Sequence, residues 1–272
     1  MFRAACLQVN AGTDLIANID AAVSLARSAD QDGADLILMP ENVSTMVWGR
    51  AAILNTAYTE EEHPALESFR ELACELAVWI HCGSLSIKLG GTRVANRSYV
   101  ISPEGTVSAW YDKVHMFDVD LGNGQKYAES STFSAGNEVV LADLPWGKLG
   151  LTICYDLRFP YLYRALAKSG AFFITVPSAF TRITGEAHWH TLLRARAIET
   201  GCYIFAPAQT GDHGKKRKTY GHALIINPWG EVVCDAGTKP GFVISDIHVK
   251  QVESARSRIP SLFHDRELLI RG

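Results

Sequence analysis

The sequence predicts an α/β fold in which two β-sheets pack face to face and helices cover both outer sides. Segments with helical periodicity and strand-like segments alternate through both halves of the 272-residue chain. A short continuous apolar run at 34–40 indicates a strand that is covered on both faces. Three Pro-x-Gly turns between strands rich in Val, Ile or Leu indicate β-hairpins, at Pro103-Glu-Gly105, Pro145-Trp-Gly147 and Pro228-Trp-Gly230.

The first half of the chain begins with a strand over residues 3–9. Thr13-Asp14 then caps a helix whose apolar residues recur at helical spacing over 15–26. The strand at 34–40 is stopped by proline, which leaves Glu41 at its carboxyl end. The other elements expected in this half are a helix at 64–77 and strands at 78–87, 98–101 and 106–110.

The segment from Asp112 to Gly136 shows little periodicity and many Gly, Asp and Ser residues, so we predict a long loop. Loops of this length are usually functional or disordered, and whether this one closes on a ligand is left open at this stage. The second half then repeats the alternation of helices and strands. Its expected elements are a helix at 160–168, a strand at 172–176, a helix at 186–200 and a strand at 202–206.

Composition narrows the class of protein. With 47% hydrophobic residues the chain can bury a sizeable core, and we expect one domain over 1–272. A formal net charge of −3 gives no basic face for nucleic acid or an acidic membrane, so small molecules are the expected partners. The chain has no signal-like apolar start, no apolar run as long as a membrane span and no CxxC pair among its six cysteines. We therefore expect a cytoplasmic protein in a reducing compartment.

Cys154 is the strongest candidate for a chemically active residue. It lies in the run Leu151-Thr-Ile-Cys-Tyr-Asp-Leu-Arg-Phe-Pro160, between an apolar strand and an amphipathic helix. A thiol at a strand-to-helix corner lies near free backbone N–H groups and the positive end of a helix, and both favour thiolate over thiol. The sequence therefore predicts a nucleophile at Cys154 with its thiolate favoured.

Three further residues are candidates for the same chemistry. Glu41 follows an apolar strand, where α/β sheets usually hold their ligands. Lys113 comes just past a strand end among aromatic and apolar neighbours, and Glu129 lies in the long loop. Taken singly, each is better explained as a helix-capping, solvated or exposed loop residue.

Together with Cys154 these residues match a family pattern. The segments Met39-Pro-Glu-Asn42, Tyr111-Asp-Lys-Val-His115, Glu129-Ser130 and 153–160 resemble the nitrilase superfamily of carbon–nitrogen hydrolases, whose members use a Glu, a Lys and a Cys in that order. The resemblance extends over nearly the whole chain, and it implies a four-layer α-β-β-α sandwich that needs no metal or organic cofactor. It is nearer to the deaminated glutathione amidase branch than to the omega-amidase branch, which typically has glycine where Ser178 stands.

The resemblance also implies a role for each residue. Cys154 would attack an amide carbonyl, and Glu41 would accept the thiol proton, deliver it to the leaving amine and later activate water. The Lys113 ammonium and the backbone N–H of Tyr155 would hold the oxyanion. Glu129 would pair with Lys113 and keep it charged.

The expected reaction is hydrolysis of deaminated glutathione to 2-oxoglutarate and Cys-Gly. An omega-amidase acting on 2-oxoglutaramate or succinamate is the alternative enzyme, and a true nitrilase is disfavoured. Two alternatives come from other classes: an interaction module without catalysis, and a redox sensor that uses Cys154 as a peroxidatic thiol. A sensor needs a resolving cysteine, and no other Cys lies close in sequence; a binding module has no need of Glu41, Lys113 and Glu129 together.

A substrate with a keto-acid carboxylate requires a cation to receive its charge. The candidates are Arg182, in the loop 180–185, and Lys126, with His188 as a further lining residue. Lys215-Lys-Arg-Lys218 is typical of a solvated hairpin, although it could also serve a carboxylate. His188-Trp-His190 lacks the spacing of known metal motifs, so we expect no metal site.

The C-terminal segment is expected to contact another subunit. Family members commonly pair through helices near the nucleophile and through this segment, which spans about 254–272 here. Its apolar residues, which include Ile259, Phe263 and Leu268-Leu-Ile270, need a partner surface. We therefore expect a homo-oligomer, a dimer or larger.

Overall fold

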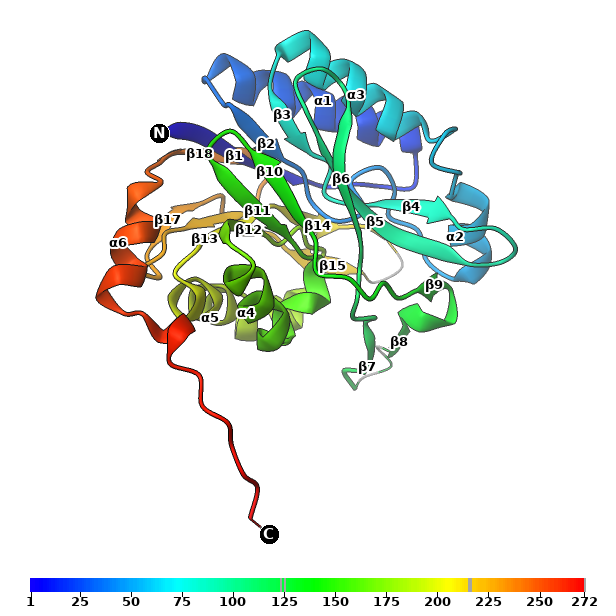
Figure 1. The fold of residues 1–272 in the computed structure, drawn as a ribbon. Helices are drawn as coiled ribbons and strands as arrows, with labels where there is room; N and C mark the ends of the chain where they lie inside the picture. Colours follow the sequence, from blue (N-terminus) through cyan, green and yellow to red (C-terminus); the bar gives the residue numbers. More distant parts are fainter. Residues whose placement is uncertain (123, 125, 215–216, 272) are drawn as a thin grey trace.

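The computed structural model describes residues 1–122, 124, 126–214 and 217–271. Two sheets pack face to face, with helices α1 and α3 on the outer side of one and α4 and α5 on the outer side of the other (Figure 1). The predicted four-layer α-β-β-α sandwich is therefore confirmed. These helices span Leu15–Gln31 (α1), Pro64–Leu76 (α3), Pro160–Lys168 (α4) and Arg182–Thr200 (α5).

The larger sheet has the strand order β15-β14-β1-β2-β3-β5-β4, with β18 also paired to β1, and β6 and β9 paired to β5. Strands β1, β2 and β3 are parallel, so their carboxyl ends meet at one edge of the sheet. The strands span Phe2–Val9 (β1), Leu36–Leu38 (β2), Trp79–His81 (β3), Leu85–Lys88 (β4), Val94–Ile101 (β5), Val107–Asp112 (β6), Phe133–Ser134 (β9), Ala208–Asp212 (β14), Lys218–Tyr220 (β15) and Gly241–Ile247 (β18).

The smaller sheet has the order β10-β11-β12-β13-β16-β17, with β11, β12 and β13 parallel. Its strands span Leu141–Leu144 (β10), Gly147–Leu151 (β11), Ala171–Thr175 (β12), Tyr203–Ala206 (β13), Leu224–Ile226 (β16) and Val232–Asp235 (β17). The remaining elements are α2 (Arg50–Thr56), α6 (Lys250–Arg258), the hairpin strands β7 (Asp118–Asp120) and β8 (Lys126–Ala128), and single 3-10 turns at Glu129–Ser131, Cys154–Arg158 and Ser261–Phe263.

The apolar runs of β1 and β2 serve two cores at once. Alternate residues of a strand point to opposite faces of the sheet. Ala4, Cys6 and Leu36 therefore join the core between the sheets, whereas Ala5 and Ile37 join the core under α1 and α3. This explains why these strands are apolar without alternation, as the sequence predicted.

The three Pro-x-Gly turns each join an antiparallel pair, β5–β6, β10–β11 and β16–β17, so the predicted hairpins are confirmed. The single strand expected at 78–87 is wrong, because Gly83 turns the chain and β5 lies between β3 and β4. The helix expected at 186–200 begins earlier, at Arg182, because Thr181 caps it by accepting from Thr184 N–H. The loop expected at 112–136 contains the hairpin β7–β8.

Gly83 couples the fold to the strand end that carries Glu41. Its φ is +38°, and a Cβ placed on it would lie 2.0 Å from the carbonyl oxygen of Pro40. The backbone of Pro40 must therefore move if any side chain is added at position 83.

We expect Gly83→Ala to lower the free energy of unfolding by about 2–4 kcal/mol, through left-handed strain and overpacking together. Gly91→Ala is the matched control, because Gly91 also has positive φ (+58°) but has nothing within 4 Å of its Cβ position. That variant should lose only about 1 kcal/mol. Denaturant unfolding measures both, and equal losses would contradict the close packing of Gly83 on Pro40.

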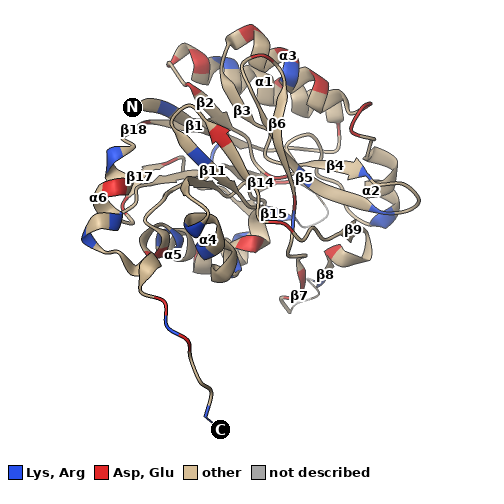
Figure 2. Ribbon diagram, in the orientation of Figure 1, with Lys and Arg blue, Asp and Glu red and all other residues tan. Residues whose placement is uncertain are grey.

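Lys and Arg are mixed with Asp and Glu on α3 and α6 (Figure 2). All six cysteines are free thiols. No helix in the described residues is long and apolar enough to cross a membrane.

Candidate active site

Glu41 lies buried at the carboxyl end of β2, with 3% of its surface exposed. Its Oε1 accepts from Lys113 Nζ and from Asn96 Nδ2, both at 3.0 Å. Its Oε2 accepts from the backbone N–H of Ala179 at 2.9 Å. The main chain is also held, because Gln209 Nε2 donates to the Glu41 carbonyl at 3.0 Å. The carboxylate is thus fixed in one orientation by donors from three other segments of the chain.

Lys113 follows β6 directly and is buried as completely as Glu41. Its ammonium contacts Glu41 Oε1 at 3.0 Å, and both oxygens of Glu129 at 3.0 and 2.9 Å. Glu129 is held in turn by the backbone N–H of Phe117 at 2.6 Å. The structure therefore brings together the three charged residues that the sequence singled out, with one cation between two anions.

Cys154 occupies the corner between β11 and the 3-10 turn Cys154–Arg158, with a φ of +50° that non-glycine residues rarely adopt. Asp156, which is fully buried, fixes this corner by accepting from Ile153 N–H, the Tyr111 hydroxyl and His115. The Cys154 thiol and the Glu41 carboxylate line the same cavity, and each shifts the pKa of the other. A strained backbone held by such a network is typical of a residue placed for chemistry.

The three groups settle into distinct protonation states. Burial raises the pKa of the Cys154 thiol well above its usual range, and the negative charge of Glu41 adds to the rise. Burial alone would raise the pKa of Glu41, but Lys113 and the hydrogen bonds from Cys154 and Asn96 outweigh it and lower the pKa. Burial alone would lower the pKa of Lys113, but Glu129 and Glu41 raise it well above its usual range. The resting site therefore contains a thiol, a carboxylate and an ammonium.

The expectation that the corner favours a thiolate at Cys154 is wrong. The backbone N–H of Cys154 already donates to the Pro177 carbonyl at 3.0 Å, so it is not available to the sulfur. The next element is a single 3-10 turn, whose dipole is small compared with that of a full helix. Desolvation consequently dominates, and the thiol needs a base, for which Glu41 is in place.

A cavity of about 660 Å³ opens over these residues. Glu41, Lys113, Glu129 and Cys154 all contribute to its wall. Its aromatic lining consists of Trp48, Phe117, Tyr127, Phe133, Tyr155 and Phe180. The backbone N–H of Tyr155 donates to no acceptor in the part of the chain that the structure describes, so it is available to a ligand oxygen beside the sulfur.

The other residues proposed from the sequence for substrate contact fall in different places. Lys126 lines the cavity at its rim, but its ammonium is largely exposed and pairs with Asp120 at 3.1 Å. Arg182 lies outside the cavity lining, with its side chain 64% exposed and its guanidinium paired with Glu186. His188 also lies outside the lining and faces Arg158 on the surface. Both belong to α5, whose first turns project these side chains away from the cavity.

Much of the segment 112–136 forms one wall of the cavity. Phe117, Tyr127 and Glu129 come from it, and strand β8 of its hairpin lines the cavity. Residues 123 and 125 of this segment lie outside the described residues, as do Lys215 and Lys216 of the basic run at 215–218.

Sequence reasoning missed three groups that complete the site. They are Asn96 and the Ala179 N–H, both on Glu41, and Asp156 beneath Cys154. Asp156 could have been found, because it follows Cys154 by two residues at the same corner. The other two come from distant segments, and no local pattern marks them. Arg217, which belongs to the basic run 215–218, also lies in the cavity wall.

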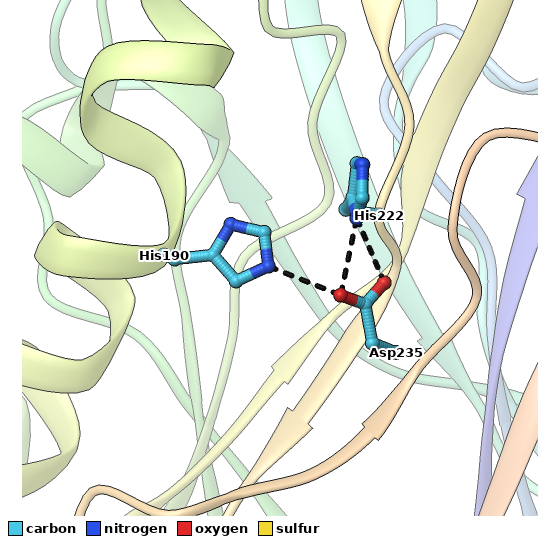
Figure 3. Close-up of side chains that lie close together, drawn as sticks. All are labelled: His190, His222 and Asp235. Atoms are coloured by element: carbon cyan, nitrogen blue, oxygen red, sulfur yellow. Dashed lines mark hydrogen bonds and ion pairs between the residues drawn. The ribbon is translucent and has the colours of Figure 1, made fainter.

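His190, considered above for a metal motif with His188, instead meets His222 and Asp235 (Figure 3). His190 Nε2 lies 3.1 Å from Asp235 Oδ2, and His222 Nδ1 lies 2.9 Å from Asp235 Oδ1. Asp235 Oδ1 also accepts from the backbone N–H of Gly237. These contacts join the three side chains, so the cluster forms a hydrogen-bonded tie between α5, β17 and the segment after β15.

A buried thiol beside a fixed carboxylate and an ammonium, with an available backbone N–H at the same point, defines a site for nucleophilic attack on an acyl carbon. The protein is therefore of the class of hydrolases that work through a cysteine. More particularly, the chain belongs to the carbon-nitrogen hydrolase family, whose profile matches residues 3–257. The predicted family and enzyme class are thereby confirmed.

Individual relatives agree with this assignment. A deaminated glutathione amidase of Synechocystis sp. (strain PCC 6803 / GT-S) is 40% identical over 272 residues, which cover 97% of each chain. The crystal structure of the C. elegans NitFhit protein is similar with a TM-score of 0.92 and 35% identity, over 97% of this chain and 65% of that one. A mutant amidase from Nesterenkonia sp. AN1, in which acrylamide has added to the active site cysteine, is similar with a TM-score of 0.80 and 25% identity, over 96% and 98% of the two chains.

Proposed function

We propose that this chain is an amidase that hydrolyses deaminated glutathione to 2-oxoglutarate and Cys-Gly. The observation that carries the proposal is the position of Lys113 Nζ between Glu41 and Glu129, in the wall of the cavity that the Cys154 thiol also lines. The deaminated glutathione amidase that is 40% identical over nearly the whole chain supports the choice of substrate.

In the first step Glu41 takes the thiol proton of Cys154 while the sulfur attacks the amide carbon. The electron pair of the C=O bond moves to oxygen, where the Tyr155 N–H and the Lys113 ammonium stabilise the charge. Lys113 contacts Glu129 through both carboxylate oxygens, so it can turn one N–H to the oxyanion and keep its partner.

The tetrahedral intermediate then collapses. The C–N bond breaks, Glu41 gives its proton to the leaving nitrogen, and Cys-Gly departs to leave a thioester on Cys154. Glu41, again a carboxylate, takes a proton from water, whose oxygen attacks the thioester carbon. The C–S bond breaks, the sulfur recovers the proton, and 2-oxoglutarate leaves.

An assay of the purified protein against deaminated glutathione, 2-oxoglutaramate, succinamate and a nitrile tests this proposal. We expect release of Cys-Gly from deaminated glutathione with the highest kcat/KM. A higher kcat/KM on 2-oxoglutaramate or succinamate, followed by free ammonia, would instead favour the omega-amidase alternative. Absence of amide hydrolysis in a folded protein would overturn the proposal.

Two details bear on the alternatives. Ser178, which distinguishes the two branches in sequence, is buried and donates to the Val176 carbonyl, and it does not line the cavity. It therefore marks the branch without contacting a ligand. The raised pKa of Cys154 counts against a peroxidatic sensor, because the thiolate is the form that peroxide oxidises.

We also propose that the chain folds as one domain over 1–272, acts in the cytoplasm and assembles as a homo-oligomer through its C-terminal segment. The end of that segment, after the turn Ser261–Phe263, extends away from the body of the molecule (Figure 1), and Phe263, Leu268, Leu269 and Ile270 are more than 80% exposed. Exposed apolar residues in such number favour a partner surface.

Light scattering during size-exclusion chromatography is expected to give the mass of a dimer or a larger assembly for the intact chain. Replacing Leu268, Leu269 and Ile270 together by serine should shift the population toward smaller species. A monomeric intact chain at micromolar concentration would contradict the assembly.

A further inference from the structure

Arg217 is a buried cation in the cavity wall, in the segment just before β15, with 8% of its surface exposed. Its Nη2 donates to the Ala179 carbonyl at 2.5 Å. The guanidinium lies 5.0 Å from the ring centroids of both Trp48 and Tyr127. Its Nε and Nη1 have no hydrogen-bond partner in the described part of the chain.

The unpaired N–H groups of Arg217 distinguish it from the other cations that line the cavity. Lys113 is paired with two carboxylates, and Lys126 with one. Arg50 donates to the backbone carbonyls of Ser131 and Thr92. Among these four described cations, only Arg217 has buried N–H groups without a hydrogen-bond partner, and no described carboxylate lies within 4.0 Å of it. Leaving a buried charged donor unpaired is costly, so such a group is typical of a site that a ligand completes.

A second unpaired donor belongs to the same wall. The indole Nε1 of Trp48 is buried and also lacks a hydrogen-bond partner among the described residues. Trp48 lines the cavity, and its ring lies against the Arg217 guanidinium. Both residues therefore present N–H donors and no acceptor, which suits an anion and excludes a cation.

The position of Arg217 relative to the reacting groups limits how far the ligand's anionic group can lie from the scissile carbonyl. Ala179 links the two, because its N–H donates to Glu41 Oε2 while its carbonyl accepts from Arg217. A single residue, Ala179, thus connects the Arg217 guanidinium to the carboxylate of the proposed base, Glu41. In a 2-oxoglutaryl group the carboxylate is separated from the scissile carbonyl by four carbon–carbon bonds, about 5 Å. The glycine carboxylate of the leaving Cys-Gly is six bonds away.

We propose that Arg217, with the Trp48 indole N–H, forms a subsite for the carboxylate of an α-keto acid on the acyl side of the substrate. This inference rests on the proposed function and specifies the substrate class of that same site. The planar guanidinium offers two N–H groups in the geometry that a carboxylate accepts. Tyr127, on β8, contacts the same guanidinium through its ring, as Trp48 does.

The test compares a charged and a neutral amide. In Arg217→Gln, kcat/KM for 2-oxoglutaramate is expected to fall about 10–100-fold, the loss of a charge-assisted hydrogen bond, while kcat/KM for butyramide stays within about threefold. Arg217→Lys should recover part of the loss. Lys218→Gln is the matched control, because it removes an exposed cation from the same segment that pairs with Asp212, and both rates should stay at the wild-type level.

Three outcomes of the kinetics would overturn the subsite. An equal fall for both amides would mean that Arg217 acts only on the fold, and thermal melting of each variant checks that reading. No change for either amide would mean that another group receives the carboxylate. A fall for deaminated glutathione without one for 2-oxoglutaramate would place Arg217 on the leaving dipeptide.

Binding separates this inference from the proposed reaction. Calorimetric titration of 2-oxoglutarate into Cys154→Ala requires no turnover, and adding Arg217→Gln should weaken the affinity by the same 10–100-fold. If the wild-type protein hydrolyses no amide but 2-oxoglutarate affinity depends on Arg217, the proposed reaction is refuted and the subsite is supported. If amides are hydrolysed but 2-oxoglutarate binds equally with and without Arg217, the subsite is refuted and the proposed reaction is supported.

Discussion

Cys154→Ala is expected to lower kcat at least about 10⁴-fold, because no other group in the cavity can form the acyl intermediate. The fold should survive, since the variant removes one sulfur and leaves the Asp156 contacts that shape the corner. The free energy of unfolding should change by about 1 kcal/mol.

Cys82→Ala is the matched control for this variant. Cys82 is a buried free thiol in the core beneath α1 and α3, and it does not line the cavity. Its replacement removes the same atom from an equally buried position, so the stability loss should be similar and the activity should be retained. Wild-type turnover by Cys154→Ala, or an equal loss in Cys82→Ala, would remove Cys154 from the mechanism.

Lys113→Met is expected to lower kcat/KM about 10²–10³-fold, because it removes a donor to the oxyanion. It should also lower the free energy of unfolding by about 3–5 kcal/mol, since Glu41 and Glu129 lose the cation that compensates their buried charge. Lys148→Met is the control. It removes a lysine that pairs with Asp143 outside the cavity, and it should leave both quantities near wild type.

The pH dependence of Lys113→Met distinguishes catalysis from stability. In the wild type Lys113 and hydrogen bonds hold the pKa of Glu41 below its ordinary value of 4.5, so kcat/KM should decline only below that pH. Without the ammonium, burial acts unopposed and raises the pKa of Glu41, so the acid limb should move toward neutral pH. An acid limb that does not move would contradict the pairing of these two groups in the working enzyme.

Local sequence patterns predicted much of the fold. The hairpins were predictable because a Pro-x-Gly turn is specified by its own residues, as at Pro145-Trp-Gly147. The split between β3 and β4 was not, because Gly83 turns the chain to fit the backbone of Pro40, which is 43 positions earlier. Helix α5 started earlier than expected because its cap, Thr181, is a single side-chain contact ahead of the apolar pattern.

In the candidate site, too, local motifs predicted some features, whereas others depend on how distant segments pack. Glu41, Lys113, Glu129 and Cys154 were selected from motifs, and the structure brings them together. The protonation state of Cys154 was not predictable, because burial depends on packing from segments far apart in the chain. Arg182 was preferred over Arg217 as the cation for a carboxylate, since exposure cannot be judged in a run of charged residues; the structure buries Arg217 and exposes Arg182.

The most direct test of the account is the mass of the enzyme during turnover. Acid quenching at short times, followed by peptide mapping, should reveal a 2-oxoglutaryl group on Cys154 with either deaminated glutathione or 2-oxoglutaramate as substrate. The two amides should leave the same adduct, because they share the acyl group and differ only in the leaving amine. Product formation with the acyl group on another residue, or with no acyl-enzyme at any quench time, would contradict it.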